Sequence, residues 1–261
     1  MPREAAYPLD YRDGGYAYVE RPNAALLALF ARHVLPSAAA PAVLDIGCGA
    51  GANARALRHL APGAYLVGIE PNPVAAELAR HACDDVFEGP ARDWPGSART
   101  FDAVILSDVI EHQVEPVDFI GQVAAHSELR AATWLVSVPN YGVWYNRWRT
   151  LWGRFDYAYS GLYDRTHLRF FTRRSLTRLL AHTGFDVVEA RCTPSLVQST
   201  APWLRRAFAA DVAAGRHLSL DDSRAFHLYS RFVEPAETLL CRAWPGLLAF
   251  QHVVAARKRG G

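Results

Sequence analysis

The chain is poor in lysine, in charge of one sign and in long apolar runs. Lys258 is its only lysine, and 28 basic residues face 26 acidic ones, a formal net charge of +2. A protein that captures nucleic acid over a broad surface carries a larger basic excess, so that class is disfavoured. The longest apolar run, Ala24 to Ala31, is too short to cross a bilayer. The first residues, Met1 to Tyr7, lack the apolar core of a signal peptide, so we expect a soluble, cytoplasmic protein without a membrane span.

Cysteine is sparse as well. Cys48, Cys83, Cys192 and Cys241 stand far apart in the sequence and form no Cys-x-x-Cys pair. This spacing predicts neither a zinc site nor a disulfide framework, and it suits a reducing compartment. With 261 residues, of which 51% are hydrophobic, the chain can bury one sizeable core. We therefore expect a single domain over residues 1–261.

Short apolar segments alternate with helical ones over the first half of the chain. This alternation is typical of a parallel sheet with helices on its faces, which is an α/β fold. Before the first strand, Pro22 is expected to open a helix in which Leu26, Leu29, Phe30 and Val34 recur at helical spacing. The predicted strands are Ala42–Gly47, Tyr65–Glu70, Asp85–Glu88, Phe101–Ser107 and Thr133–Val138, and the predicted helices between them are Ala52–Leu60, Pro73–Ala82 and Pro116–Ala125.

After Pro139 the alternation breaks. Residues 140–171 are rich in aromatic residues and arginine, and we interpret them as a cap or lid. The elements predicted beyond the cap are a helix at Arg173–Thr183, a strand at Val187–Cys192, a helical insertion over residues 194–245 with pieces at Ala201–Gly215 and Asp221–Ala243, and a final strand at Leu247–Arg257.

The most informative motif is a glycine-rich loop after the first predicted strand. Val43 to Gly51 joins an apolar strand to glycines at positions 47, 49 and 51, and Glu70 closes the next strand. Glycines let the backbone approach a ligand, a helix start offers unpaired N–H groups, and a carboxylate about 20 residues further on can bind a ribose. A dinucleotide fingerprint needs Gly-x-Gly-x-x-Gly to seat a pyrophosphate, and this loop has a different spacing. The sequence therefore predicts a ribose-bearing cofactor other than a dinucleotide.

This loop resembles that of the class I S-adenosylmethionine (SAM) methyltransferases. The resemblance covers Val43 to Cys192 and implies a doubly wound, Rossmann-like sheet of seven strands, with the last strand antiparallel between the fifth and the sixth. It makes SAM the expected cofactor. The roles it implies are Gly47 and Gly49 beside the methionine part, Asp45 supporting the amino group through the loop, Glu70 on both ribose hydroxyls, and Pro71 and Asn72 along the adenine.

Two further pairs of residues extend the expected cofactor site. The segment Phe101 to His112 resembles the fourth strand and following turn of the same family, which places Ser107 and Asp108 at the carboxyl edge of the sheet, where ligands bind. By the same resemblance, Tyr18 and Arg21 are candidates for holding the SAM carboxylate. A packed tyrosine and a surface arginine are the alternative for that pair.

Adenine recognition departs from the family pattern. Relatives often place an acid just after the third strand, beside the adenine amine, and here Pro90 occupies that position. Glu88, Asp93 or backbone groups are the substitutes that the sequence offers.

Two histidines are candidates for a catalytic base. His112 follows the fourth strand, and His167 lies in Tyr163 to Thr172, a block that resembles a signature of bacterial methyltransferases related to the ubiquinone-biosynthesis O-methyltransferases. A base near the acceptor hydroxyl can add roughly 10²–10⁴-fold to the rate. We favour His167, because it borders the expected lid. For either histidine, a structural ring bonded to backbone is the alternative.

The spacing of Asp108, Glu111 and His112 also raises a metal hypothesis. Positions i, i+3 and i+4 share one face if the turn is helical, and some ubiquinone-pathway relatives use a similar set for a divalent ion. Glu-His at this point is also frequent in relatives without a metal. We therefore predict no metal cofactor.

The predicted cap mixes positive charge with aromatic rings. Eight arginines lie between Arg147 and Arg178, interleaved with Trp148, Trp152, Phe155, Tyr157, Tyr159 and Tyr163. Arginine pairs with carboxylate or phosphate and stacks on rings, so the cap suits an anionic or aromatic small molecule. RNA is an alternative ligand, and a solvated basic face over an aromatic core is another.

These observations predict a SAM-dependent methyltransferase that acts on a small molecule, most simply on a hydroxyl oxygen of a natural product, a sugar or an aromatic acid. The fourth strand ends in Ser107-Asp108-Val109-Ile110 and lacks the Asp/Asn-Pro-Pro-Tyr clamp for a flipped base, so no DNA partner is expected. The alternatives are a non-catalytic SAM-binding scaffold, an RNA methyltransferase and a nicotinamide-dependent dehydrogenase. The oligomeric state is not predicted.

Overall fold

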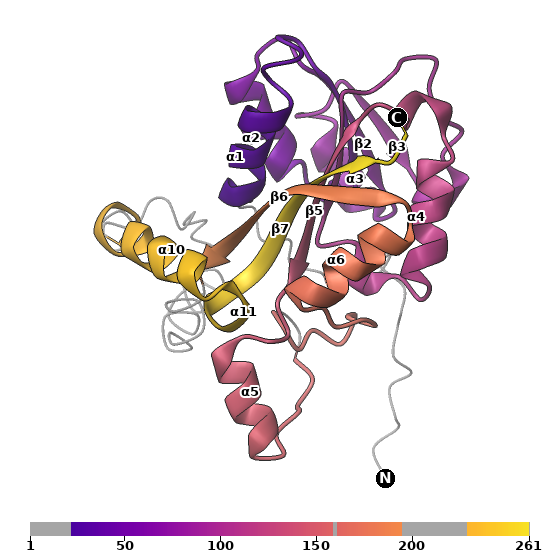
Figure 1. Cartoon of the computed structure of the whole chain (residues 1–261). Helices are drawn as coiled ribbons and strands as arrows, with labels where there is room; N and C mark the ends of the chain where they lie inside the picture. Colours follow the sequence, from indigo (N-terminus) through magenta and orange to yellow (C-terminus); the bar gives the residue numbers. More distant parts are fainter. Residues whose placement is uncertain (1–21, 159–160, 195–228, 261) are drawn as a thin grey trace, which may run out of the picture.

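One seven-stranded sheet forms the centre of the molecule. The computed structural model describes residues 22–158, 161–194 and 229–260. The strand order is β3-β2-β1-β4-β5-β7-β6, and every pair is parallel except those of β7, which runs antiparallel to both β5 and β6 (Figure 1). The predicted doubly wound sheet is therefore confirmed. The strands are β1 (Ala42–Ile46), β2 (Tyr65–Glu70), β3 (Asp85–Glu88), β4 (Ala103–Ser107), β5 (Thr133–Pro139), β6 (Phe185–Pro194) and β7 (Ala249–Lys258).

Helices connect the strands and begin at residues suited to capping. Asn23, Asn72 and Thr172 are the N-caps of three of them, and the side-chain oxygen of each accepts a backbone N–H of the first turn. The α-helices are α1 (Ala24–His33), α2 (Ala52–Leu60), α3 (Pro73–Ala79), α4 (Pro116–Ala124), α5 (Trp144–Leu151), α6 (Arg173–His182), α10 (Glu234–Ala243) and α11 (Pro245–Leu248). Short turns of other helix types are η1 (Ala91–Asp93), η2 (Ile110–His112), η3 (Ser127–Leu129) and η5 (Tyr229–Val233).

The sheet is covered on both faces, and each face has its own hydrophobic core. Alternate residues of a strand point to opposite faces, so Val43 packs with α1 and α2 while its neighbour Leu44 packs with α4 and α6. Figure 1 shows α1 and α2 on one side of the sheet and α4 and α6 on the other. Burial on both faces explains why the central strands are continuous apolar runs.

Several boundaries differ from the predicted ones for local reasons. Helix α1 begins at Ala24, because Asn23 rather than Pro22 supplies the capping side chain. Leu247 and Leu248 belong to α11, so the final strand begins at Ala249. Strand β6 extends to Pro194, which is two residues beyond its predicted end. The predicted piece Ala201–Gly215 lies outside the described residues, as does Asp221–Ala243 before residue 229.

The cysteines lie closer together than their sequence spacing suggested. All four are free. A Cβ on Gly68 would lie 2.6 Å from the sulfur of Cys48 and 3.3 Å from that of Cys83, so both thiols occupy the space beside this glycine. The other two cysteines, Cys192 and Cys241, share a small buried cluster between β6 and α10. The thiols therefore pack in pairs, and all but that of the partly exposed Cys83 are buried.

The segment predicted as a cap leaves the sheet at the end of β5. Asn140 and Phe171 form an isolated parallel bridge, so the two ends of this segment lie side by side. Between them, α5 projects beyond the edge of the sheet (Figure 1). Among the described residues, no helix is long and apolar enough to cross a membrane.

Candidate active site

The topology brings four predicted site segments to one edge of the sheet. Strand β1 pairs in parallel with β2 on one side and with β4 on the other, and β5 follows β4. All four therefore end at the same edge, and the chain changes direction of winding between β1 and β4. Open α/β sheets bind ligands at such a switch point, outside the carboxyl ends of the strands.

The loop after β1 requires glycine at specific positions. Gly47, Gly49 and Gly51 all have positive φ angles, of 72°, 55° and 83°. At Gly47 a Cβ atom would also lie 2.7 Å from Cγ2 of Val109, so the loop lies tightly against the turn after β4. Gly51 is the N-cap of α2 and supplies no side-chain capping bond, which leaves the first N–H groups of the helix to other acceptors.

Glu70 lies buried at the end of β2 and is bonded to the neighbouring loops. Its side chain is 3% exposed. One carboxylate oxygen accepts a hydrogen bond of 2.9 Å from the N–H of Gly49, and the other accepts one of 2.9 Å from the N–H of Asn72. The acid predicted to hold the ribose is thus at the predicted place, and it also fixes the glycine loop against β2.

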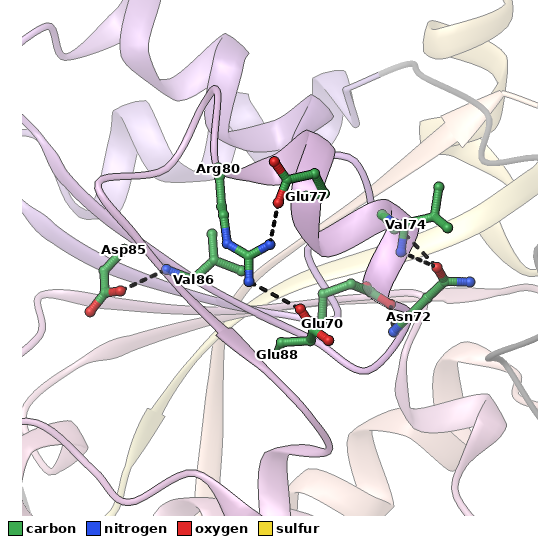
Figure 2. A network of polar contacts seen from close by, with 9 residues as sticks. Glu70, Asn72, Val74, Glu77, Arg80, Asp85, Val86 and Glu88 are labelled. Atoms are coloured by element: carbon green, nitrogen blue, oxygen red, sulfur yellow. Dashed lines mark hydrogen bonds and ion pairs between the residues drawn. The ribbon is translucent and has the colours of Figure 1, made fainter.

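The region after Glu70 is organised by the start of α3. Asn72 accepts hydrogen bonds from the N–H groups of Val74 (2.9 Å) and Ala75 (3.1 Å). Figure 2 shows Asn72 directed at Val74, and it shows Glu77 and Glu88 both directed at the guanidinium of Arg80.

Both acids proposed as substitutes for adenine recognition are exposed and lie beside arginines. Glu88 is paired with Arg80 at 3.0 Å on the surface, and Asp93 is exposed and lies 3.7 Å from Arg92. Backbone groups near Pro90 stay the simplest expectation for adenine.

Asp45 is a buried acid inside β1. The side chain is 3% exposed, and within the described part of the chain neither carboxylate oxygen has a hydrogen-bond partner. Burial, with the charge of Glu70 as a second cause, raises the pKa of Asp45 to about 8. A cationic group that reaches this acid stabilises its charged form.

Asp108 adopts an unusual backbone conformation at the end of β4. Its φ angle is 55°, the only positive value of a non-glycine residue within the described ranges. One carboxylate oxygen accepts a hydrogen bond from the hydroxyl of Ser137 (3.2 Å), and the other accepts one from the side-chain amide of Gln251 (2.6 Å). Ser107 joins the same group, because its hydroxyl lies 3.2 Å from that of Ser137.

The structure brings the two candidate histidines together. The ring centroids of His112 and His167 are 4.8 Å apart in an edge-to-face arrangement. Nδ1 of His112 lies 3.0 Å from the carbonyl oxygen of Thr166, and Nδ1 of His167 lies 3.2 Å from that of Leu162. A carbonyl oxygen only accepts, so each Nδ1 carries the hydrogen and each neutral ring has its lone pair on Nε2.

Burial keeps both rings neutral. It lowers the pKa of His112 to about 4, and the neighbouring His167 contributes to this shift. Burial also lowers the pKa of His167. The carbonyl of Leu162 and the charge of Asp164 oppose this lowering. Two rings this close do not both take up a proton easily, because the first charge disfavours the second.

Glu111 completes this cluster in place of Asp108. Its carboxylate is 1% exposed, neither oxygen has a partner among the described residues, and burial followed by the charge of Asp108 raises its pKa well above the ordinary value. Ligand atoms of Glu111, His112 and His167 all lie within 4.8 Å of one another. His167 thus lies where the sequence spacing had suggested Asp108, whose carboxylate oxygens accept hydrogen bonds from Ser137 and Gln251. No ion is assigned to the cluster.

Three of the arginines in the cap bind the protein itself. Arg147 donates to the carbonyls of Gly142 and Gly246, and Arg169 donates to that of Val114. Arg149 lies over the ring of Tyr163, with 4.6 Å from its guanidinium carbon to the ring centroid.

The aromatic residues of the cap divide into packed and exposed groups. Phe155 packs against Tyr141, Tyr163 and Phe170, whereas Trp148 and Trp152 are exposed and contact each other. Phe155 and Phe170 also keep about a third or more of their surface exposed, so the cap presents aromatic surface beside its arginines.

Two predicted site residues, Tyr18 and Arg21, lie outside the described residues, and two residues of the site were not predicted. Ser137 and Gln251, which hold Asp108, were missed because nothing local in the sequence links them to a residue 29 or 143 positions away.

The fold and the site together define a Rossmann-like α/β protein with the architecture of class I methyltransferases. A family profile described as "Methyltransferase domain" matches residues 13–190, and the chain belongs to this family. This is the family of class I SAM-dependent methyltransferases, in which SAM is the cofactor.

Similar proteins agree with this assignment. The chain is 36% identical over 86 residues to the mitochondrial ubiquinone biosynthesis O-methyltransferase of Schizosaccharomyces pombe, a match that covers 30% of this chain and only 31% of the relative. A SAM-dependent methyltransferase structure from Archaeoglobus fulgidus is 18% identical, with a TM-score of 0.53 and coverage of 88% of this chain and 92% of that one. The structure of the [4+2]-cyclase SpnF is 20% identical, with a TM-score of 0.53 and coverage of 90% and 81%. These two structures show the fold, and the cyclase shows that the fold alone does not fix the reaction.

The site residues fit the chemistry of SAM. SAM carries a cationic amino group, a cationic sulfur and a ribose diol, and it has no phosphate. The orphaned oxygens of Asp45 suit a cation, and buried Glu70 at the end of β2 suits the diol. The cradle formed by Gly47 and Gly49 leaves backbone within reach of a ligand.

Proposed function

We propose that the protein methylates a hydroxyl oxygen of a small molecule, with His167 as the general base. The observation that carries this proposal is the pair of neutral rings, buried His167 and partly buried His112, whose Nδ1 hydrogens are donated to backbone carbonyls. A neutral imidazole with its lone pair on Nε2 is the form that accepts a hydroxyl proton.

The cofactor would be held as the family resemblance implies. The expected contacts are Asp45, Gly47 and Gly49 at the methionine part, Glu70 at the ribose, and the backbone of Pro71 and Asn72 along the adenine. Ser107 and Asp108 border the same edge from β4. Tyr18 and Arg21 stay candidates for the SAM carboxylate.

Bound SAM supplies a methyl carbon attached to a cationic sulfur, and the lone pair of an acceptor can attack that carbon as the carbon–sulfur bond breaks. Since such a displacement needs little beyond positioning, the protein contributes mainly by orienting the acceptor and removing its proton. Nε2 of His167 would take the hydroxyl proton as the oxygen–carbon bond forms. An amine acceptor would need this base less.

His167 is a better base than His112. The pKa of His112 is lowered to about 4, so that ring holds a proton weakly. Efficient bases have a pKa closer to the working pH. Asp164, whose charge raises the pKa of both rings, contributes to the basicity of His167. His112 would then orient and shield its neighbour.

The acceptor class follows from the segment around α5. We propose a small anionic or aromatic molecule, such as a natural product, a sugar acid or an aromatic acid, held near the cap at 140–171. The support is chemical: the exposed ring of Trp148 lies in α5 together with Arg147 and Arg149, and the exposed ring of Trp152 is at the C-cap of that helix.

Binding and transfer assays test the proposal in two stages. Calorimetric titrations with SAM, S-adenosylhomocysteine and NADH should give binding of the first two and none of NADH. Transfer of a labelled methyl group is then measured on a panel of phenols, hydroxy acids, sugars, amines and RNA. Transfer to hydroxyl compounds supports the proposal, and preferential transfer to amines or RNA overturns it.

Binding without transfer to any acceptor would favour the non-catalytic alternative. Where the wild type does transfer a methyl group, the His167→Gln variant tests the base, since it removes the basic ring without changing the predicted SAM contacts. A catalytic role predicts slower transfer with unchanged SAM affinity.

A further inference from the structure

A continuous chain of polar side chains connects the end of β4 to the start of α1. Gln251, in the final strand, donates from its amide nitrogen to the carboxylate of Asp108 at 2.6 Å. The amide oxygen of Gln251 accepts from the side-chain amide of Asn23 (3.4 Å) and from the hydroxyl of Thr193 (3.2 Å). These contacts join β4, β7, β6 and the N-cap of α1.

The same chain continues to the helix after the glycine loop. The backbone N–H of Asn23 donates to the side-chain oxygen of Asn53 at 3.2 Å, and Asn53 is the second residue of α2. Asn23 also follows closely after the segment that contains Tyr18 and Arg21. The elements expected around the methionine part of SAM are thus connected through Gln251.

Asp108 needs this support, because its conformation is strained and its side chain is partly buried. A non-glycine residue with positive φ is strained and persists only where its surroundings fix it, and such residues concentrate at functional sites. Two hydrogen bonds from Ser137 and Gln251 satisfy the carboxylate, and the backbone N–H of Asp108 is held by Ser137 as well.

Only an amide of this length makes all the contacts of Gln251. The end that faces the carboxylate must donate, and the end that faces Asn23 and Thr193 must accept, so the partners fix the orientation of the amide. Methionine matches the size and makes none of these bonds. Glutamate keeps the acceptor end and places an acid against Asp108.

We propose that Gln251 is a positioning residue of the cofactor site, which holds the Asp108 carboxylate charged and in one orientation beside the cationic part of SAM. This inference rests on the proposed site, in which Asp108 borders the cofactor. Gln251 acts through Asp108 and does not itself touch SAM.

The charge state of Asp108 gives the proposal a distinctive signature. Burial raises the pKa of Asp108 to about 6, and the bonds from Ser137 and Gln251 oppose that rise. Within the described ranges, the acid whose charge interacts with Asp108 is Glu111, in η2, whose pKa is itself raised well above normal. Loss of Gln251 should therefore raise the pKa of Asp108 further and discharge the carboxylate at a higher pH.

The experiment measures SAM affinity by calorimetry between pH 5.5 and pH 8.5. The proteins compared are the wild type, Gln251→Met, Asp108→Asn, the double variant and Gln122→Met, which makes the same change on the exposed surface of α4. We expect Gln251→Met to move the acidic limb of the affinity profile up by about one pH unit, which weakens binding about twofold near pH 7 and about eightfold at pH 5.5. Gln122→Met should retain the wild-type profile.

Non-additivity provides the decisive readout. If Gln251 acts through Asp108, Gln251→Met causes little further loss in the Asp108→Asn background. An unchanged acidic limb in Gln251→Met, or fully additive losses in the double variant, overturns the inference. Should Gln251→Met fail to fold, Gln251→Glu takes its place, with a larger upward movement of the limb expected. A wild type that does not bind SAM would instead refute the proposed site.

Discussion

One oxygen of the Glu70 carboxylate accepts a hydrogen bond of 2.9 Å from the backbone N–H of Gly49. The acid expected to bind the ribose therefore also holds the glycine loop in place, and its second oxygen holds Asn72 at the start of α3. A single buried side chain thus links the ends of β1 and β2, so changes at Glu70 are expected to affect the shape of the site as well as its contacts.

Replacing Glu70 should weaken SAM binding and destabilise the fold together. Glu70→Ala removes the acceptor of two buried N–H groups, and each unsatisfied group costs about 1–3 kcal/mol. We expect a loss of about 10–100-fold in SAM affinity by calorimetry, with a lower melting temperature. Glu70→Gln keeps the size of the side chain and one acceptor oxygen, so its melting temperature should stay closer to the wild-type value than its SAM affinity does. Glu77→Ala, at an exposed acid of α3, is the control, and wild-type affinity in Glu70→Ala would exclude Glu70 from the site.

Asp45→Asn should stabilise the ligand-free protein at pH 8 while weakening SAM binding. Asp45 has an ordinary pKa of 3.8 that burial raises to about 8 in the folded state. The protonated acid therefore contributes its full share to the free energy of unfolding below about pH 4. That contribution falls by about 1.4 kcal/mol per pH unit as the pH rises from about 4 to 8. Asparagine does not ionise, so it avoids that loss.

Thermal unfolding at pH 5 and pH 8 measures this effect. The melting temperature of Asp45→Asn should exceed that of the wild type by more at pH 8 than at pH 5. Asp118→Asn, on the exposed surface of α4, should show no such difference. Equal gains at both pH values would show that Asp45 does not carry a raised pKa.

Gly47→Ala should damage the loop even though it adds one methyl group. The new Cβ would lie 2.7 Å from Val109, and the residue would keep a φ of 72° that alanine adopts poorly. We expect a lower melting temperature and a loss of SAM affinity of at least about tenfold. Val109→Ala in the same protein should restore part of the stability, since it removes the clash but leaves the backbone strain.

Gly121→Ala is the matched control for that change. Gly121 lies within α4, and a Cβ added there would meet no other atom within 4 Å, so alanine should stabilise the helix by up to about 1 kcal/mol. Equal melting temperatures for the Gly47 and Gly121 variants would contradict the clash with Val109.

His167→Ala should slow methyl transfer by about 10²–10⁴-fold with SAM affinity nearly intact. A base works in its neutral form, and the lowered pKa of His167 keeps it neutral below its ordinary value of 6.5. The rate of the wild type should therefore hold down to a pH below 6.5 before it falls. Rates are measured on the acceptor that the transfer panel identifies.

The effect of His112→Ala on the same reaction should be smaller, because the pKa of His112 is already about 4. Unchanged turnover in His167→Ala would remove that residue from the role of base. A larger loss in His112→Ala would transfer the role to His112.

Local patterns in the sequence predicted the parallel strands and the glycine loop well. Buried parallel strands appear as apolar runs, and the turn from β1 into α2 needs glycine where φ is positive, so both features are written in neighbouring residues. The antiparallel placement of β7 came from family resemblance, and the pairing with β5 and β6 confirms it.

Contacts between distant residues were not predictable in the same way. The bond between Gln251 and Asp108 spans 143 positions, and no periodicity encodes it. The sequence spacing suggested Asp108 beside Glu111 and His112, whereas the structure places His167 there. This contact was missed for the same reason, because it joins residues far apart in the sequence. Helical spacing placed Asp108 with its neighbours, whereas the strained turn after β4 directs its side chain toward β5 and β7.

The position of β7 also sets the order in which the sheet can form while the chain is synthesised. Among the described strands, β6 pairs only with β7, which is synthesised after it. Strand β6 therefore has no strand to pair with until residues 249–258 have left the ribosome. The nascent sheet meanwhile ends at an open β5. Gln251 arrives with the same strand, and therefore the nascent enzyme closes its sheet and completes the support of Asp108 in a single late step.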